Sequence, residues 1–166
     1  GFRCEKFRED DQIAAMRLMN TLLGGSPHSL LFRNVREKLG LCYYCMSSYD
    51  RLKDVMLVDS GVDGKHAARA QEAVLSQLDA VCRGEFTNDD VEAARRILVN
   101  QFNTVSDLQS SITGWYLGQS LEKSPISPVD AAQQLENVTR DHIIQAACRM
   151  KLGAVYMLSG EDELDE

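Results

Sequence analysis

The sequence predicts an α+β fold, in which an antiparallel sheet is covered on one face by helices. Runs with strand character stand at the beginning, in the middle and near the end of the chain, and apolar residues recur at helical spacing between them. Glycine, proline and capping residues separate these stretches. The resulting order of a strand, two helices, two strands, a helical run and a last strand indicates one mixed layer.

Length and composition predict a single domain. The 166 residues are 44% hydrophobic and 26% charged, which suits one compact core. We expect the domain to span residues 1–160 and the acidic residues 161–166 to form a disordered tail. That tail holds most of the net charge of −7, so the body is nearly neutral. Without a basic face, nucleic acid is not an expected partner.

No stretch of the sequence predicts a membrane partner. No apolar run approaches the roughly 20 residues of a spanning helix, and no signal-peptide pattern opens the chain. We therefore expect a soluble, cytoplasmic protein. The opening Gly1-Phe2-Arg3 lacks an initiating methionine and has the character of a strand interior. We expect the first strand to be truncated and the chain to be part of a longer protein.

The first half of the chain contains three expected strands and two expected helices, which turn residues separate. The acidic residues 9–11 suit a helix start, Gly24-Gly25 ends that helix, and Gly40 ends the next. In order, the expected elements are a strand over 1–7, a helix from 9 to 23, a helix from about 29 to 39, and strands over 41–49 and 55–62 joined by a turn at 50–53.

The second half is expected to be helical up to a final strand. Thr87 and Asp90 resemble a capping box, Pro128 suits a first helical position, and Thr139 suits an N-cap. Trp115 and Tyr116 are interpreted as core anchors. The expected elements are helices over 65–83, 87–105, 110–121, 128–136 and 139–150, followed after Gly153 by a strand over 154–158.

Five cysteines are scattered through the chain, which favours a reducing compartment over a disulfide scaffold. Cys42 and Cys45 match the pattern C-x-x-C. Residues three apart in a strand point to opposite faces, so we expect these two thiols to lie apart and to be structural.

Arg36 and Tyr43 are the candidate functional pair. Read alone, they would be part of a solvated helix end and one of several strand aromatics. However, Phe32 and Arg36 share a helix face, and Gly40 turns the chain into the strand that holds Tyr43. A guanidinium and a phenol that converge there would suit a peptide carbonyl, or the oxyanion formed during its hydrolysis.

The run LGGSPHSLLFRNVREKLGLCYYCMSSYD resembles the second, non-zinc half of the insulinase, pitrilysin and mitochondrial processing peptidase family of inverzincins. In that family a glycine turn, a helix ending in arginine and a tyrosine seven residues later recur. The resemblance is strong over residues 23–62 and weak elsewhere, and it implies the same α+β half-domain. It also implies that Arg36 and Tyr43 act on the peptide. Phe32, Gly24 and Gly25 are expected to bind substrate, although this glycine turn is short and less glycine-rich than the family's loop.

The zinc motif of that family is missing from this sequence. Inverzincin catalysis needs H-x-x-E-H plus a distant acidic ligand, and none of His28, His66 and His142 begins such a motif. We expect no metal in this chain and zinc in a partner half, so the chain alone is predicted to be inactive. A nucleophile elbow, a phosphate loop and a dinucleotide fingerprint are also absent from the sequence.

Two functions of different class follow. In the first, the chain is the substrate-binding half of a zinc endopeptidase and pairs with a zinc-binding N-terminal half-domain or a homologous subunit. In the second, it belongs to a non-catalytic member of the family, a binding or scaffold subunit that pairs with an active homologue. A plain α+β interaction domain that shares only the architecture is a third interpretation. An H-x-x-E-H upstream of Gly1 would favour the first over the second.

Overall fold

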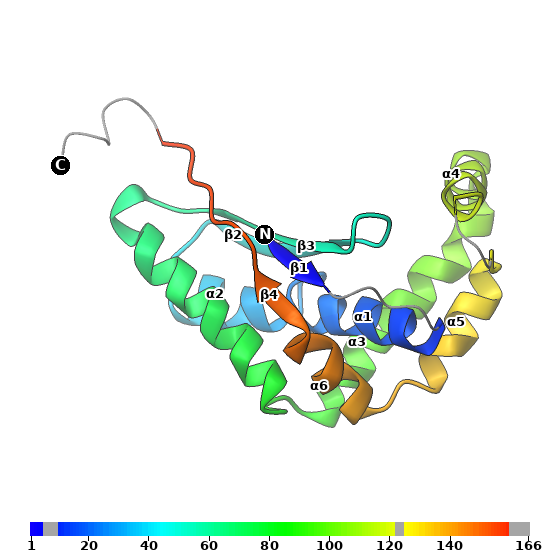
Figure 1. Cartoon of the computed structure of the whole chain (residues 1–166), viewed down its shortest axis with the longest axis horizontal. Coiled ribbons are helices and arrows are strands. Elements are labelled where there is room, and N and C mark those ends of the chain that lie inside the picture. Colours follow the sequence, from blue (N-terminus) through cyan, green and yellow to red (C-terminus); the bar gives the residue numbers. More distant parts are fainter. Residues whose placement is uncertain (5–9, 122–124, 160–166) are drawn as a thin grey trace.

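The computed structural model describes residues 1–4, 10–121 and 125–159, and its strands form one antiparallel sheet in the order β2-β3-β1-β4 (Figure 1). The predicted α+β class is confirmed. The expected end of the first strand at residue 7, the acidic residue 9 and the tail 161–166 lie outside the described residues. The elements, in order, are β1 (Phe2–Cys4), α1 (Asp10–Leu23), η1 (Leu31–Lys38), β2 (Tyr44–Asp50), β3 (Val55–Gly61), η2 (Gly64–His66), α2 (Ala67–Cys82), α3 (Asn88–Asn103), η3 (Thr104–Asp107), α4 (Gln109–Gln119), α5 (Pro128–Glu136), α6 (Arg140–Cys148) and β4 (Met150–Leu152).

One face of the sheet is buried against the helices. In the register of the sheet, Phe2 lies opposite Met56 of β3 and Leu152 of β4. Successive side chains of a strand alternate between faces. Phe2, Met56, Cys45 and Met150 are buried toward the helical layer, whereas Met46 on the other face is exposed. Figure 1 shows the sheet on one side of this layer.

Helix α1 is the centre of the core. Its residues from Ile13 to Leu23 are largely buried, and Met16, Leu18 and Met19 are fully buried. The helix packs against α3, α5 and α6 as well as β2, so it has neighbours on several sides. A helix with such surroundings needs apolar side chains over most of its circumference rather than on one stripe.

Three capping boxes start helices in the second half. Thr87 caps α3 with Asp90, Ser127 caps α5 with Asp130, and Thr139 caps α6. In each box the N-cap hydroxyl accepts a backbone N–H, and a side chain three residues later accepts the N-cap N–H. The predicted helix starts at residues 87, 128 and 139 are confirmed.

The predicted strand over 154–158 is wrong. The last strand is β4, and residues 153–159 have no regular secondary structure. The physical reason lies in the partner strand. β4 pairs with β1, and that pairing ends where the N–H groups of Gly153 and Ala154 donate to the carbonyl of Gly1. Beyond this point, no backbone among the residues that the structure describes pairs with the segment.

Trp115 and Tyr116 differ in their surroundings. Trp115 contacts the core, meets Phe102 edge-on at 5.4 Å between ring centroids, and donates its indole N–H to the carbonyl of Ile126 at 3.0 Å. Tyr116 is exposed, so its predicted role as a core anchor is wrong. Successive residues of a helix point about 100° apart around its axis. When only one side of α4 is covered, Trp115 can therefore contact the core while Tyr116 stays exposed.

The prediction that Cys42 and Cys45 lie on opposite faces of one strand is wrong in its premise. β2 begins only at Tyr44, after a bend, so Cys42 lies outside the strand and does not follow its alternation. Burial, and then the charge of Cys42, raise the pKa of Cys45 to about 12. Both are free cysteines.

Candidate functional site

The helix η1 presents the candidate residues and is held by an unusual hydrogen-bonding pattern. Its last turn is wide, because Leu39 donates its N–H to the carbonyl of Asn34 five residues earlier. Gly40, at φ +60°, then reverses the chain so that Leu41 donates to the carbonyl of Val35. The predicted end of the helix at Gly40 is confirmed. The chain therefore leaves η1 close to the last turn of that helix.

Arg36 lies between Phe32 and Tyr43. Its guanidinium carbon is 4.6 Å from the centroid of the Phe32 ring, and its Nε donates to the backbone carbonyl of Tyr43 at 2.9 Å. The shared helix face of Phe32 and Arg36 is thus present. The guanidinium is exposed, and Nε is the only nitrogen of Arg36 with a hydrogen bond to any residue that the structure describes.

The hydroxyl of Tyr43 points to a different partner. It donates to Oδ1 of Asp63 at 3.0 Å, while the other carboxylate oxygen of Asp63 lies 3.9 Å from Nζ of Lys65. The hydrogen bond to Asp63, followed by the negative charge of Asp63, raises the pKa of Tyr43. The Tyr43 side chain is 71% exposed, so this phenol stands on the surface as a protonated group.

Arg36 and Tyr43 are therefore brought together, but through the Tyr43 main chain rather than its hydroxyl. Asp63 was missed in the sequence. The hairpin register pairs Tyr44 with Gly61 and so sets Tyr43 opposite Val62, next to Asp63, but the alternation of a regular strand would put the Tyr43 and Asp63 side chains on opposite faces, so the register gave no clear signal. We call Phe32, Arg36, Tyr43 and Asp63 the arginine–tyrosine cluster. It offers hydrogen-bond donors and one carboxylate acceptor on an exposed end of the hairpin.

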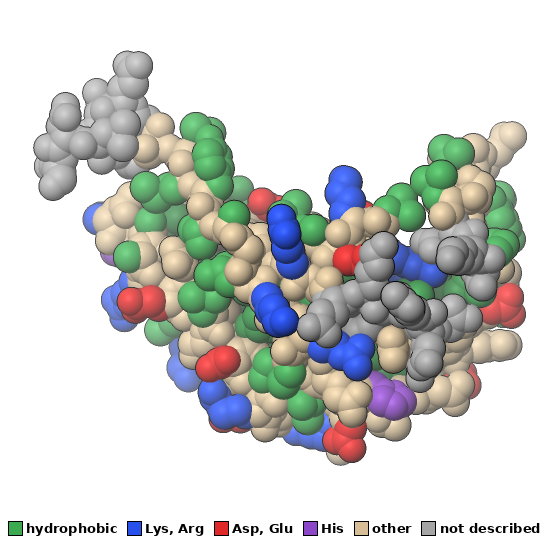
Figure 2. All heavy atoms as spheres, in the orientation of Figure 1, with side chains coloured by type: hydrophobic (Ala, Val, Ile, Leu, Met, Phe, Trp, Pro, Cys, Tyr) green, Lys and Arg blue, Asp and Glu red, His purple; other side chains and the backbone are tan. Residues whose placement is uncertain are grey.

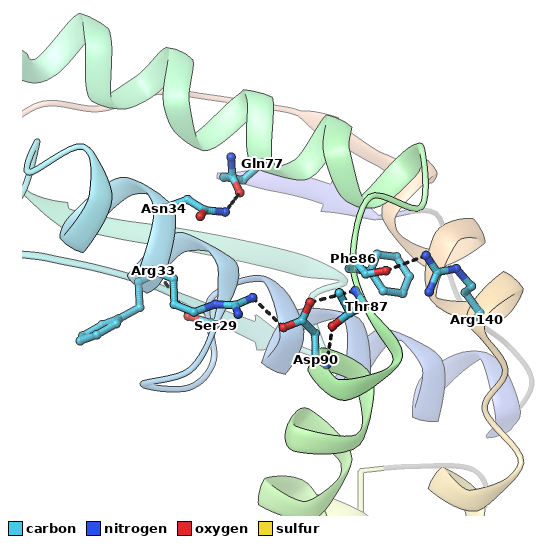
Figure 3. A network of polar contacts seen from close by, with 9 residues as sticks. Ser29, Arg33, Asn34, Gln77, Phe86, Thr87, Asp90 and Arg140 are labelled. Carbon is cyan, nitrogen blue, oxygen red and sulfur yellow. Dashed lines mark hydrogen bonds and ion pairs between the residues drawn. The ribbon is translucent and has the colours of Figure 1, made fainter.

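Two neighbours of Arg36 anchor η1 from the other side (Figure 3). Arg33 forms an ion pair with Asp90 at 2.7 Å, and Asn34 donates to the side chain of Gln77 in α2 at 2.6 Å. Burial alone would raise the pKa of Asp90, but hydrogen bonds from Thr87 and the nearby Arg33 hold it below its usual value. These contacts fix the helix that carries Arg36 onto α2 and α3.

The two predicted glycines pack inside the fold. The carbonyl of Gly24 accepts the N–H of Ser47 at 3.0 Å, and a Cβ at Gly24 would lie 2.7 Å from both the backbone N and Oγ of Ser47. A Cβ at Gly25 would lie 2.9 Å from Cα of Thr21. Close backbone approach thus explains both glycines, and their part in substrate binding stays a prediction.

Metal ligands do not gather in the part of the chain that the structure describes. No three His, Cys, Asp or Glu side chains come close enough there to hold an ion. His142 instead belongs to the capping box of α6, where its Nδ1 accepts the N–H of Thr139 at 3.4 Å. The described residues thus do not fit the zinc ion of the family motif. Among the same residues, no helix has the length and apolar character to cross a membrane.

Comparison with known proteins places this arrangement in a family. The profile described as "Peptidase M16 inactive domain" matches residues 1–98, which is more than half of the chain and includes the whole arginine–tyrosine cluster. The Bacillus subtilis (strain 168) protein named "Probable inactive metalloprotease YmfF" is 30% identical over 162 residues. These residues are 98% of this chain but 38% of the relative, so the chain spans well under half of that protein's length.

Solved structures share the fold. A conserved protein from Enterococcus faecalis V583 superposes with a TM-score of 0.82 and 27% identity, over 90% of this chain and 36% of that one. A peptidase M16 inactive domain from Pseudomonas fluorescens superposes with a TM-score of 0.74 and 20% identity, over 90% of this chain and 37% of the other. The second likeness concerns the fold alone.

Proposed function

The chain belongs to the peptidase M16 inactive-domain family, and from this premise we propose that it is the peptide-binding, non-zinc half of a zinc endopeptidase. The observation that carries the proposal is the exposed arginine–tyrosine cluster, which sits at one end of the hairpin on a firmly anchored helix. In this proposal the metal belongs to a partner half, a zinc-binding half-domain or a homologous subunit. This chain contributes only binding and orientation.

Arg36 is suited to hold a peptide carbonyl or a developing oxyanion. Its Nε is engaged by the Tyr43 carbonyl, which fixes the plane of the guanidinium. The Phe32 ring supports one side of that plane at 4.6 Å. Nη1 and Nη2 are then a preorganised pair of donors, and a donor that needs no rearrangement when charge develops stabilises the transition state most effectively. Phe32 adds an apolar contact for the peptide.

The hydroxyl of Tyr43 is suited to donate a hydrogen bond to the peptide. Because Asp63 raises the pKa of Tyr43, the phenol keeps its proton over a wider pH range than a free tyrosine. The Tyr43 hydroxyl must give up its hydrogen bond to Asp63 before it can donate to a peptide. We propose that Asp63 then accepts a backbone N–H of the peptide, so that one residue pair contacts both kinds of backbone group.

The second candidate is a non-catalytic subunit that pairs with an active homologue. The specific observation in its favour is the relative named "Probable inactive metalloprotease YmfF", which is similar along nearly the whole chain. In that case the cluster binds a peptide or a partner segment without any chemistry. Gly24 and Gly25 belong to the same proposal as substrate-binding residues, although their close packing has its own structural reason.

The test uses the chain assembled with its zinc-binding partner and a quenched-fluorescent peptide. Arg36→Ala should lower turnover, whereas Lys38→Ala, which removes another exposed basic residue of the same helix, should leave it unchanged. Equal turnover in both variants would contradict the proposal. A stable complex without turnover would favour the non-catalytic subunit. Metal analysis should find no stoichiometric zinc in the isolated chain. One zinc per isolated chain would contradict the proposal that the metal belongs to a partner half.

A further inference from the structure

Two cysteines end neighbouring helices. Cys82 is the last residue of α2, and Cys148, 66 positions later, is the last residue of α6. The two helices pack against each other in the helical layer (Figure 1). The fold therefore brings two thiols from distant parts of the sequence to one place on the molecule.

The side chain of Cys148 points at the end of α2. Its thiol donates to the backbone carbonyl of Cys82, with 3.7 Å between Sγ and the oxygen. The last carbonyls of a helix have no partner within the helix, so this one can accept the thiol. A carbonyl oxygen lies about 2.4 Å from Cα of its own residue, which puts Sγ of Cys148 within about 6 Å of Cα of Cys82. Since a disulfide joins Cα atoms about 4.4–6.8 Å apart, side-chain rotation can bring the two sulfur atoms together.

The preceding turns of α6 fix the direction in which Cys148 points. Ile144 stands four residues before Cys148, so the two side chains share a face of the helix. Ile144 packs against the core, and a Cβ at Gly84, just past the end of α2, would lie 3.1 Å from its Cδ1. Arg140, four residues earlier again, donates to the carbonyls of Gly84 and Phe86. This face of α6 is thus held against the end of α2 and the turn that follows it.

Access from solvent differs between the two thiols. Cys148 is exposed, whereas Cys82 is partly buried. Burial raises the pKa of Cys82 to about 12, and a hydrogen bond with the Cys148 thiol and then the charge of that thiol add to the effect. Figure 2 shows charged side chains of both signs among apolar ones over α2 and α6, as on a surface that faces water. Because the thiolate is the attacking species, a reagent in solution reacts with Cys148 first.

We propose that Cys82 and Cys148 are a reversible modification site that takes a low-molecular-weight disulfide and becomes a disulfide itself. In the first step, the Cys148 thiolate attacks one sulfur of the small disulfide, and the other half leaves as a thiolate. In the second, Cys82 gives up its proton, its sulfur attacks Sγ of Cys148, and the remaining half leaves as a thiolate. The two cysteines lose two protons and two electrons, and the reagent is reduced to two thiols.

The first step prepares Cys82 for the second. The hydrogen bond with the Cys148 thiol and the charge of that thiol both contribute to the raised pKa of Cys82. A mixed disulfide at Cys148 carries neither a thiol proton nor a thiolate charge, so both contributions disappear and the pKa of Cys82 falls toward the value that burial alone sets. The packed helices already hold the two residues together, so closing the disulfide requires no loop closure.

The cysteine pair is separate from the arginine–tyrosine cluster. α2 has 16 residues and begins soon after Asp63, so Asp63 and Cys82 stand at opposite ends of a helix about 24 Å long. The inference therefore goes beyond the proposed function and does not depend on it. The new bond would tie α2 to α6 and constrain the unfolded chain, so the oxidised protein should be the more stable form.

The experiment incubates the native chain with oxidised glutathione and then alkylates it under denaturing conditions. Wild type should lose two of its five alkylatable thiols and retain no glutathione. A non-reducing tryptic digest should contain residues 70–83 linked to residues 141–149. The oxidised chain should melt about 5–15 °C above the reduced chain, and dithiothreitol should reverse both changes.

Three variants separate the two steps. Cys82→Ser should keep one glutathione on Cys148, because no second thiol resolves the mixed disulfide. Cys148→Ser should keep all of its remaining thiols under the same conditions. Cys42→Ser is the matched control, since Cys42 is also partly buried, and it should still form the bond between Cys82 and Cys148. Recovery of all five thiols from wild type would overturn the proposal. A disulfide between any other pair, or glutathione that stays on Cys148 in wild type, would overturn it as well.

Discussion

The hydroxyl of Tyr43 donates to Oδ1 of Asp63 at 3.0 Å, across 20 residues of sequence. The two residues lie at the open end of the β2–β3 hairpin, where the strands leave the sheet. The Asp63 carboxylate both accepts the proton-bearing hydroxyl and repels the phenolate, so it keeps Tyr43 protonated. The sequence identified Tyr43 as a candidate functional residue but did not identify Asp63.

The first prediction concerns the titration of Tyr43. Asp63→Asn removes the negative charge, so the pKa of Tyr43 should fall toward the ordinary tyrosine value of about 10. Tyrosine ring NMR signals followed against pH measure this directly. Asp59→Asn, which removes a carboxylate from the same hairpin, should leave the Tyr43 pKa where it is. The same titration in wild type and Asp63→Asn would contradict the hydrogen bond.

The second prediction compares two glycines. Gly24→Ala places a Cβ 2.7 Å from Ser47 and from the Leu31 side chain, so it should lower the free energy of unfolding by roughly 1–3 kcal/mol. Gly118→Ala meets nothing within 4 Å and lies in α4, so better helix propensity should raise it by roughly 0.5–1 kcal/mol. Urea denaturation measures both. A neutral Gly24→Ala would show that the turn is free to bind rather than packed.

The third prediction concerns acid. The pKa of Asp90 is lowered in the folded protein. Its contribution to the free energy of unfolding is therefore present above its unfolded pKa of about 3.9 and is lost as the pH falls through its folded pKa. Asp90→Asn should therefore lower stability at neutral pH by roughly 0.5–1.5 kcal/mol and flatten the loss below pH ~4. Denaturation curves at several pH values measure this. Asp89→Asn is the matched control, since Asp89 lies outside the capping box, and an equal effect there would contradict the assignment.

Local signals in the sequence predicted much of the fold. The capping boxes at Thr87 and Thr139, the first-turn Pro128 and the helix stop at Gly40 all depend on residues a few positions apart, and each is present. The failed predictions depend on partners far away in the sequence. The segment 154–158 has strand propensity, yet a strand also needs a neighbouring backbone.

In the candidate site, too, local contacts could be predicted from the sequence and contacts between distant residues could not. The contact of Arg36 with Phe32 is local and could be predicted from helical spacing. Asp63 reaches Tyr43 only because the hairpin brings its two ends together, and Cys42 lies outside β2 because the chain bends before that strand. Gly24 could be identified as a helix stop, whereas its close approach to Ser47 required the tertiary structure.

The fourth prediction concerns the cysteines. The five residues are free thiols, so titration under denaturing, non-reducing conditions should find about five groups. In the native protein the exposed Cys148 should react with iodoacetamide fastest. Cys45 should react slowest, since burial raises its pKa to about 12 and little thiolate forms. Labelling of Cys45 as fast as Cys148, or a disulfide between Cys42 and Cys45, would contradict the structure.

The most direct test of the proposed function is the kinetics of Tyr43→Phe in the chain assembled with its zinc-binding partner. If the hydroxyl donates only to the transition state, kcat should fall by about 10²–10³ with little change in KM, as for the loss of one oxyanion donor. Arg36→Lys should retain part of the activity lost in Arg36→Ala, because lysine keeps the charge without the fork. The melting temperature of each variant separates function from folding. A Tyr43→Phe protein that melts earlier but cleaves peptide at the wild-type rate would contradict the proposal and assign the Tyr43–Asp63 pair to the fold.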